Sequence, residues 1–301
     1  MMKQHKADLI ILLVTLFWGT SYLFMKIGLD TLQPFNLILL RFGVAFIAAG
    51  CLFYKRILHA SRKTIHYSLL LGSLLFGHFA CITVGLRSTS TSNAGFLMSL
   101  TVIFVPILTA LFMKNKPGKR IIAGIAVAVV GIGLLTLKPH TALQSGDVWC
   151  ILAALLFAIH IIITGHAAKK TDSIGSGILQ LGFTAFFGLI FSLLFEKPEL
   201  PATTSGWMSV LALGVFCSAV GFVLQAIAQK YTSPTHTGLI FALEPVVATV
   251  CGIAFMEETI TLQGYIGAVL VLLGVAFSEI DFRKLWPGRK RQTLLHIHDV
   301  K

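Results

Sequence analysis

The stretch GKRIIAGIAVAVVGIGLL, at residues 118–135, is similar to a second stretch much later in the chain, TLQGYIGAVLVLLGVAF, at residues 261–277. When the two are aligned, two glycines of each coincide at an offset of 143 residues: Gly124 with Gly267, and Gly131 with Gly274. Glycines seven residues apart lie on one helix face, where the missing side chain lets a neighbouring helix approach closely. We therefore expect the two stretches to be equivalent packing helices of an internal repeat.

The chain around these stretches has the composition of a membrane protein. Of its 301 residues, 56% are hydrophobic and only 12% are charged, and the mean hydropathy is +0.86. A soluble domain carries about 25% charged residues, and a helix needs about 20 consecutive apolar residues to cross a bilayer. The apolar runs here are much longer than the roughly 10-residue alternating strands of a membrane barrel, so they are predicted to be helices.

Polar breaks divide the chain into ten apolar runs, which predict ten transmembrane helices. They cover residues 8–29, 34–54, 67–87, 93–113, 120–138, 147–167, 174–195, 206–229, 235–256 and 262–281. The first run begins like a secretory signal, but no small-residue cleavage site closes it, so we interpret it as a retained helix. The five cysteines lie in separate runs without a CxxC pair, which indicates neither a disulfide framework nor a metal site.

The repeat predicts two halves of five helices each, at residues 8–138 and 147–281. Gly95 and Gly238 also align at the offset of 143 residues, so runs one to five correspond to runs six to ten. Because five is an odd number, the two halves must have opposite orientations in the membrane. Inverted repeats of this kind are typical of secondary transporters, which bind substrate near the midplane between the repeats.

Lys and Arg residues are distributed unevenly between the two predicted sides of the membrane. With the N-terminus in the cytoplasm, 19 of the 24 lie in inner segments and only three, Arg87, Lys138 and Lys197, in outer ones. The positive-inside rule then predicts that both termini are cytoplasmic. This arrangement accounts for the net charge of +12 without a nucleic-acid partner, and the basic tail at 282–301 is expected to lie along the anionic leaflet.

Several motifs place the chain in a known superfamily. The first run contains LFWGTSYLFMKIGL and the second LLRFGVAFIAAG, and the ninth contains LEPVVATVCGIAFMEE. With five helices duplicated to ten, the chain resembles the drug/metabolite transporter superfamily, most closely its EamA-type branch. The resemblance implies export of small metabolites, often amino acids or amphipathic compounds, from a central cavity across the cytoplasmic membrane. It also implies that the fifth and tenth helices form a scaffold.

Glu244 and Pro245 are the most unusual pair of residues in the ninth run. Charged side chains near the bilayer centre are costly, so each is a candidate functional residue. Glu244 could carry a proton for coupling, bind a substrate ammonium group, or pair with a buried cation or helix end. Pro245 has no N–H, so a kink with a free carbonyl is expected there, and Pro106 predicts the same in the fourth run. The freed carbonyls at these kinks would line a cavity, or the kinks would only allow the helices to pack together.

Other polar residues within the spans are candidates for substrate binding or coupling. Arg41 lies about seven residues from the outer end of its helix, roughly 10 Å deep. It could bind a substrate carboxylate, close a gate with an acid, snorkel, or form a structural pair. His78 and His160 could carry protons or be hydrogen-bonded interior residues. No cluster of His or acidic residues indicates a metal.

Trp18 lies at mid-height in the first run, away from the interface where Trp usually collects, so it could form a wall of the substrate site or pack between helices. Asn93, which follows the polar run STSTS, is expected near the mouth of the cavity. Gln180 and Gln225 lie in the inner halves of their runs and could line the cytoplasmic side.

These features favour a secondary transporter working by alternating access. A small-molecule substrate and the lipid bilayer are its expected partners, and proton coupling is an open alternative. No Walker motif indicates an ATP-driven step, and no cofactor is implied. The polar residues are dispersed singly, so a membrane-embedded enzyme is disfavoured, and the absence of charged rings disfavours a channel. An uncoupled facilitator stays open. One deep acid without a deep base disfavours polyanionic substrates, and the sequence gives no indication of the oligomeric state.

Overall fold

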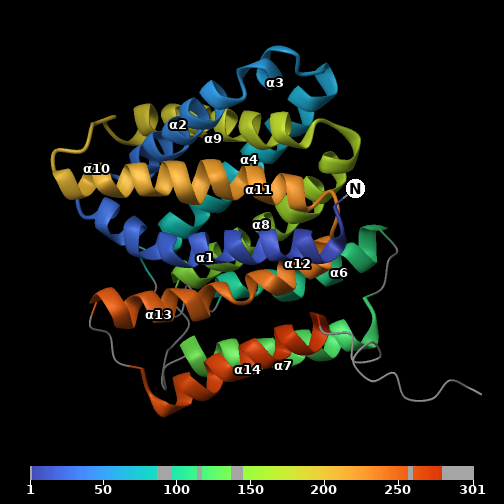
Figure 1. Cartoon of the computed structure of the whole chain (residues 1–301). Helices are drawn as coiled ribbons and strands as arrows, with labels where there is room; N and C mark the ends of the chain where they lie inside the picture. Colours follow the sequence, from blue (N-terminus) through green and yellow to red (C-terminus); the bar gives the residue numbers. More distant parts are fainter. Residues whose placement is uncertain are drawn as a thin grey trace, which may run out of the picture.

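The computed structural model describes residues 2–86, 88, 97–113, 117–136, 145–256 and 260–279, and all regular elements within these ranges are helical. The first half contains α1 (Gln4–Leu29), α2 (Pro34–Leu52), α3 (Tyr54–Leu58), α4 (Arg62–Leu86), α6 (Thr101–Met113) and α7 (Lys119–Thr136). The second half contains α8 (Ser145–Lys170), α9 (Ser173–Phe195), α10 (Thr204–Leu211), η1 (Ala212–Val220), α11 (Gly221–Ala228), α12 (Pro234–Phe241), α13 (Glu244–Met256) and α14 (Leu262–Glu279). The helices form a bundle of roughly parallel rods (Figure 1).

Within the described ranges, seven helical segments are long and apolar enough to cross a membrane. They cover Gln4–Leu29, Pro34–Leu52, Arg62–Gly85, Ser145–Lys170, Ser173–Phe195, Thr204–Ala228 and Pro234–Phe255. Two shorter apolar helices cover Leu97–Phe112 and Leu262–Ser278. Large apolar side chains such as Leu52, Ile107 and Phe112 are exposed on the outer faces, where lipid would surround them. The protein is therefore an all-helical membrane protein.

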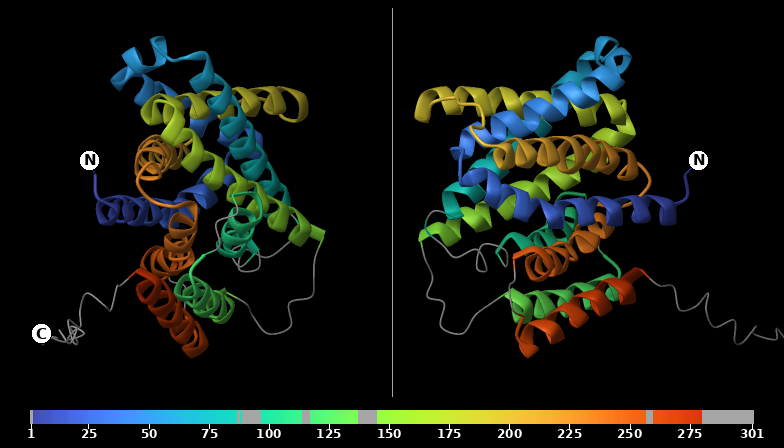
Figure 2. Two further views of the ribbon diagram at one scale, coloured as in Figure 1. Left: turned by 90° about the vertical axis from the view of Figure 1, so that its right-hand side faces the viewer. Right: turned by 60° about the vertical axis from the view of Figure 1, so that its left-hand side comes forward.

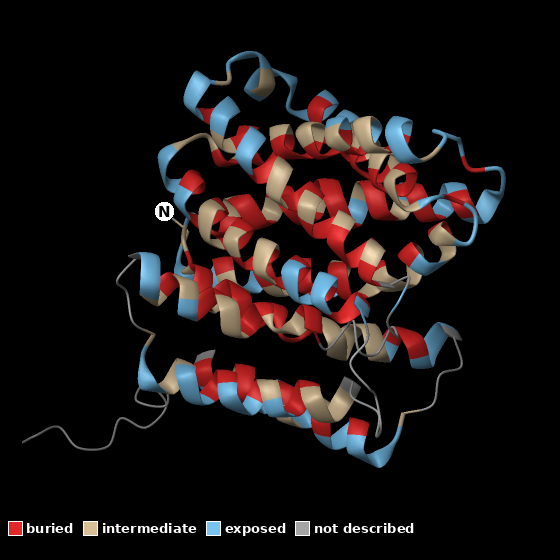
Figure 3. Cartoon of the chain, turned by 180° about the vertical axis from the view of Figure 1, so that it is seen from behind, coloured by how far each residue is buried: buried red, intermediate tan, exposed pale blue. Residues whose placement is uncertain are grey.

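Helices α1 and α8 form the centre of the bundle. α1 packs against α11, α12, α13 and η1, and α8 packs against α4, α6 and α12. Ile11 and Val14 of α1 and Ala153 and Ala158 of α8 are completely buried. Figure 3 shows that buried residues are concentrated where the inner helices face one another, and exposed residues at the ends and outer faces. The polar residues that point inward from these helices are thus enclosed by protein.

Helices α7 and α14 pack against each other along one edge of the bundle, as the views in Figure 1 and Figure 2 agree. A Cβ atom added at Gly124 would lie 2.7 Å from the carbonyl oxygen of Gly274. One added at Gly131 would lie 2.7 Å from the carbonyl oxygen of Gly267. The prediction that these glycines permit close helix packing is confirmed, and the reversed order of the pairs means that the two helices are antiparallel.

The ninth predicted run forms two helices, α12 and α13, with a break between them. Ala242 and Leu243 form a turn, and the N–H of each donates at 3.0 Å to the carbonyl three residues earlier. Pro245 follows in the first turn of α13 and has no N–H for the carbonyl of Phe241, as helical bonding would require. The break therefore lies directly before Glu244.

The fourth predicted run has its break at Leu100, which forms a turn between the helical residues 97–99 and α6. Leu100 and Leu243 are separated by 143 residues, so the two breaks occupy equivalent positions. Pro106 lies inside α6, which continues through it, so the helix does not end there, and the expected kink stays a prediction. A proline removes only one backbone bond, and membrane helices tolerate this when neighbouring helices satisfy the freed carbonyl.

The eighth predicted run forms one continuous helix that contains an irregular central segment. Its middle third, η1, has the wider π-helical hydrogen bonding, between α10 and α11. π-helical segments are rare and are frequently found at functional sites. Hydrophobic patterning does not predict this segment, and its physical role becomes apparent from the side chains that it contacts.

Candidate functional site

Glu244 is the first residue of α13, so its carboxylate lies at the positive end of a helix inside the bundle. Backbone N–H groups in a first helical turn are unpaired and favour a negative charge. The backbone of α1 passes close by, because a Cβ at Gly19 would lie 3.1 Å from the carbonyl oxygen of Glu244. Glu244 remains partly exposed, in contrast to the buried residues 241–243 before it. This combination positions an acid at an accessible point in the interior.

Tyr22 of α1 lies close enough to Glu244 for the two groups to interact electrostatically, and it is also partly exposed. The phenol can donate to the carboxylate or accept from its protonated form, so it can serve either state of the acid. Sequence reasoning missed Tyr22. The available signal was its spacing of four residues from Trp18, which places both on one face of the first helix.

Arg41 is buried, with 3% of its surface exposed, and its guanidinium is held inside the bundle rather than at the outer surface. Its Nε donates to Ser218 Oγ of η1 at 2.6 Å, and its guanidinium carbon lies 4.7 Å from the centre of the Phe79 ring. Arg41 and Glu244 interact electrostatically, but no carboxylate within the described ranges lies within 4.0 Å of Arg41. A buried cation in this state can receive an anionic group of a ligand.

Trp18 belongs to an aromatic cluster that we define as Trp18, Phe157, Phe222 and Phe241. The indole ring centre lies 4.8 Å from those of Phe222 and Phe241, and 5.6 Å from that of Phe157. The cluster joins α1, α8, α11 and α12, and Phe241 is the last residue before the helix break. It therefore forms an apolar wall directly beside the position of Glu244.

The π-helical segment explains how Trp18 is oriented. The indole Nε1 donates to the carbonyl oxygen of Cys217 at 2.8 Å, and the Cys217 thiol donates to the carbonyl oxygen of Phe17 at 3.2 Å. Widened turns release backbone carbonyls, which then accept from side chains. η1 thus holds both Trp18, through Cys217, and Arg41, through Ser218.

The two predicted histidines are buried and hydrogen-bonded. His78 Nδ1 lies 3.1 Å from the carbonyl oxygen of Ala153, and His160 Nε2 lies 2.9 Å from Gln180 Oε1. Both rings stack on Phe157, with centres 4.7 and 5.8 Å from it, respectively. The structure therefore brings both histidines to the aromatic cluster, although they lie on different helices.

The central group thus comprises Trp18, Arg41, His78, His160 and Glu244. Pro106 lies within α6. Asn93 lies outside the described residues. No group of three or more His, Cys, Asp or Glu residues in the described ranges is arranged to hold a metal ion.

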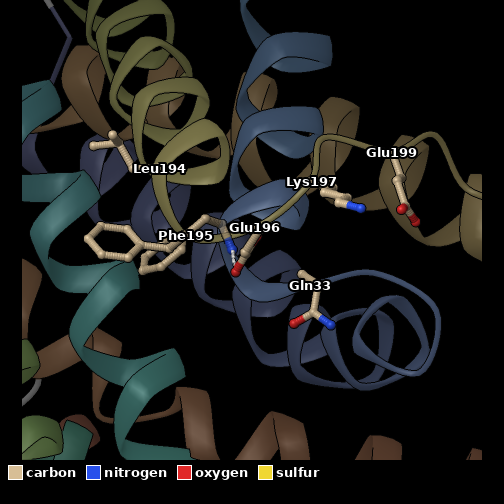
Figure 4. A pocket seen from close by; sticks show the side chains of 7 residues that line it. Gln33, Leu194, Phe195, Glu196, Lys197 and Glu199 are labelled. Atoms are coloured by element: carbon tan, nitrogen blue, oxygen red, sulfur yellow. Dashed lines mark hydrogen bonds between the residues drawn. The ribbon is translucent and has the colours of Figure 1, made fainter.

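A separate hollow of about 650 Å³ lies at the N-terminus of α2 (Figure 4). It is lined by Gln33, Phe35, Leu194, Phe195, Glu196, Lys197 and Glu199. The Glu196 carboxylate accepts from the backbone N–H groups of Phe35 at 3.0 Å and Asn36 at 2.9 Å. This acid therefore caps α2, which gives it a structural role away from the central group.

Comparison with known proteins identifies the family. The profile of the EamA-like transporter family matches residues 5–137 and 144–279, which is nearly the whole of the described bundle. The chain belongs to the EamA-like transporter family. As an EamA-like transporter, it is a multi-pass membrane transporter and not an enzyme.

Relatives of this EamA-like transporter match it over most of their length. An uncharacterized transporter of Archaeoglobus fulgidus is 30% identical over 92% of this chain and 87% of its own. The uncharacterized transporter YoaV of Bacillus subtilis is 25% identical, with 93% and 98% covered. Protein PagO of Salmonella typhimurium is 24% identical, with 82% and 84% covered.

A solved crystal structure has the same fold as this EamA-like transporter. It superposes with a TM-score of 0.78 over 93% of this chain and 99% of the other, at 20% sequence identity. At that identity the likeness concerns the fold alone. The side chains of the central group determine which substrate fits.

Proposed function

We propose that this protein is a secondary transporter that exports small organic metabolites, such as amino acids or amphipathic compounds, across the cytoplasmic membrane by alternating access. The observation that carries the proposal is that Glu244, at an internal helix break, and the buried Arg41 interact electrostatically. The two side chains are nevertheless too far apart to form an ion pair. An acid and a base held apart in this way can bind the ammonium and carboxylate groups of one substrate.

The aromatic cluster supports a substrate with an apolar part. Trp18, Phe222 and Phe241 offer ring faces beside Glu244, and aromatic faces also attract cations. Glu244 would either receive the substrate ammonium or carry a proton that couples transport to a pH gradient, with the Tyr22 phenol close by. His78 and His160 would assist such proton movement from the far side of Phe157.

The proposed topology is a ten-helix inverted repeat with both termini in the cytoplasm. The glycine contacts of α7 and α14 support the two halves at 8–138 and 147–281. The two helices are antiparallel, as expected for equivalent helices of an inverted repeat. The distribution of Lys and Arg supports the orientation, and it places the basic tail at 282–301 in the cytoplasm. Equivalent helix breaks at Leu100 and Leu243 would allow the halves to rock about a central site.

A substrate screen in liposomes tests this function. Purified protein is reconstituted and supplied with labelled amino acids, polyamines and cationic dyes, with and without a pH gradient. We expect saturable flux of one class that shows counterflow against unlabelled substrate. Flux that does not saturate and shows no counterflow would instead establish an uncoupled, channel-like facilitator.

A further inference from the structure

Four polar residues on α8, within α11 and directly after it form a group of which only His160 also belongs to the central group. This group, here named the α8–α11 polar cluster, consists of His160, Thr164, Gln225 and Gln229. Each has at most 1% of its surface exposed. Five of their side-chain atoms have no hydrogen-bond partner in the described part of the protein: His160 Nδ1, Thr164 Oγ1, Gln225 Nε2, Gln225 Oε1 and Gln229 Oε1.

Two contacts place members of the cluster where α8 packs against α11 and its end. Gln229 Nε2 donates to the carbonyl oxygen of Ile161 at 3.0 Å, and the rings of Phe222 and His160 meet edge to face at 6.0 Å. Gln225 follows Phe222 by three residues and precedes Gln229 by four, so helical spacing places it on the same face.

The same spacing joins the two members on α8. His160 and Thr164 are four residues apart and therefore lie one above the other on one helix face. A Cβ at Gly165, the next residue, would lie 3.8 Å from Gln229 Nε2. The contacts of Gly165 and Ile161 with Gln229, and of His160 with Phe222, therefore place the cluster along one contact between the two helices.

Buried polar atoms without partners are costly, and native proteins satisfy nearly all of them. Gln225 is the extreme case, because neither end of its carboxamide has a partner and none of its surface is exposed. The cluster contains no charged side chain, and it offers amide donors, carbonyl acceptors and a hydroxyl that can do either. Such a set matches a small neutral ligand that both donates and accepts.

We propose that the α8–α11 polar cluster binds a group of buried water molecules that connects His160 with the end of the bundle where α11 meets α12. Water is the neutral ligand that occupies buried polar sites with two to four hydrogen bonds. At one side of this group, His160 stacks on Phe157 of the aromatic cluster and bonds to Gln180. At the other side, Gln229 directly follows α11 and precedes the connection to α12 (Figure 1).

This site extends beyond the proposed function, because it requires no transported substrate. Its consequence is that water enters the interior from one end of the bundle and is bound there by uncharged side chains. His160, which lies beside the aromatic cluster, would then exchange protons with solvent through water, whereas the comparably buried His78 would not.

Hydroxyl-radical footprinting by X-ray radiolysis and mass spectrometry tests the proposal on the full chain in detergent, because radicals form on bound water and modify adjacent side chains. His78 is the matched internal control. It is 6% exposed, its Nδ1 is bonded to the Ala153 carbonyl, and its ring stacks on the same Phe157. We expect His160 to be modified severalfold faster than His78. Equal or slower modification of His160 would overturn the proposal.

A variant pair sharpens the test. Gln225→Met keeps the length and flexibility of the side chain and removes both of its hydrogen-bonding groups, so modification of His160 should slow towards the rate of His78. Ser192→Ala is the control, since Ser192 is also buried and unpartnered but lies at the opposite end of α9 from Gln180. It should leave the rate at His160 unchanged. If Gln225→Met does not fold, the wild-type comparison of the two histidines decides alone.

Discussion

The indole N–H of Trp18 donates a hydrogen bond to the carbonyl oxygen of Cys217 at 2.8 Å, and this bond joins the first helix of the chain to the π-helical segment of the eighth. Both groups are buried, so the bond is protected from competition by solvent. Through it, an irregular stretch of backbone fixes the largest side chain of the aromatic cluster.

Trp18→Phe should therefore weaken both folding and transport. The substitution keeps the aromatic packing but leaves the Cys217 carbonyl unpaired, which costs about 1–3 kcal/mol for a buried acceptor. Thermal unfolding in detergent and transport in liposomes would measure the loss. Trp207→Phe is the matched control, because Trp207 lies on α10 with 39% of its surface exposed, and it should change neither. Equal effects of the two substitutions would contradict the role of the bond.

Glu244→Gln should lower transport about tenfold or more and flatten its dependence on pH, since hydrogen bonds to a charged group contribute about 1.5–3 kcal/mol. The amide keeps the shape and can still interact with Tyr22, but it can neither gain nor lose a proton. Flux would be measured across the pH range in liposomes. Glu199→Gln, at an exposed position, serves as the control. Unchanged flux with an unchanged pH profile would refute a coupling or binding role for Glu244.

Arg41→Ala should reduce transport of substrates with a carboxylate more than transport of cations. Arg41→Lys should restore little, because an ammonium group reproduces neither the planar stacking on Phe79 nor the Nε bond to Ser218. Uptake of paired substrates with and without a carboxylate measures the difference. Lys26→Ala, an exposed position on α1, is the control. An equal loss for both substrate types would indicate that Arg41 only stabilises the fold.

Gly131→Ala should destabilise the contact of α7 with α14. The added methyl group would lie 2.7 Å from the carbonyl oxygen of Gly267, and overpacking of this kind typically costs about 1–3 kcal/mol. Gly43→Ala is the matched control, since a Cβ at Gly43 meets nothing within 4 Å. Melting temperatures in detergent would compare the two. A Gly131→Ala protein as stable as the control would show that the helices can separate without loss.

Hydrophobic patterning predicted the helices closely. The runs at 174–195 and 262–281 correspond to α9 (Ser173–Phe195) and α14 (Leu262–Glu279), because polar residues and prolines end apolar runs at the limits of a lipid-embedded helix. The glycine register also predicted that α7 and α14 are equivalent helices with close packing at their glycines, although not that each is the other's partner. A repeat carries long-range information that a single helix does not.

The details of the central group could not be predicted in the same way. Which residues meet depends on the rotation of each helix, and a nearly uniform apolar sequence does not fix it. The interaction of Tyr22 with Glu244 and the hydrogen bond of Trp18 to Cys217 are examples. Pro106 shows a related limit, because a missing N–H indicates that one backbone bond is lost but not whether the helix ends there or continues.

The glycine contacts of α7 and α14 are images of one another, since the offset that aligns Gly124 with Gly267 also aligns its partner Gly274 with Gly131. A contact of this type is self-complementary, as in a two-fold dimer. Because the two halves are joined in one chain, they keep this shared contact, and the sequence of each half can change without the same change in the other. Thr101 now occupies the position equivalent to Glu244, so a single acid stands where strict symmetry would have placed two repelling charges.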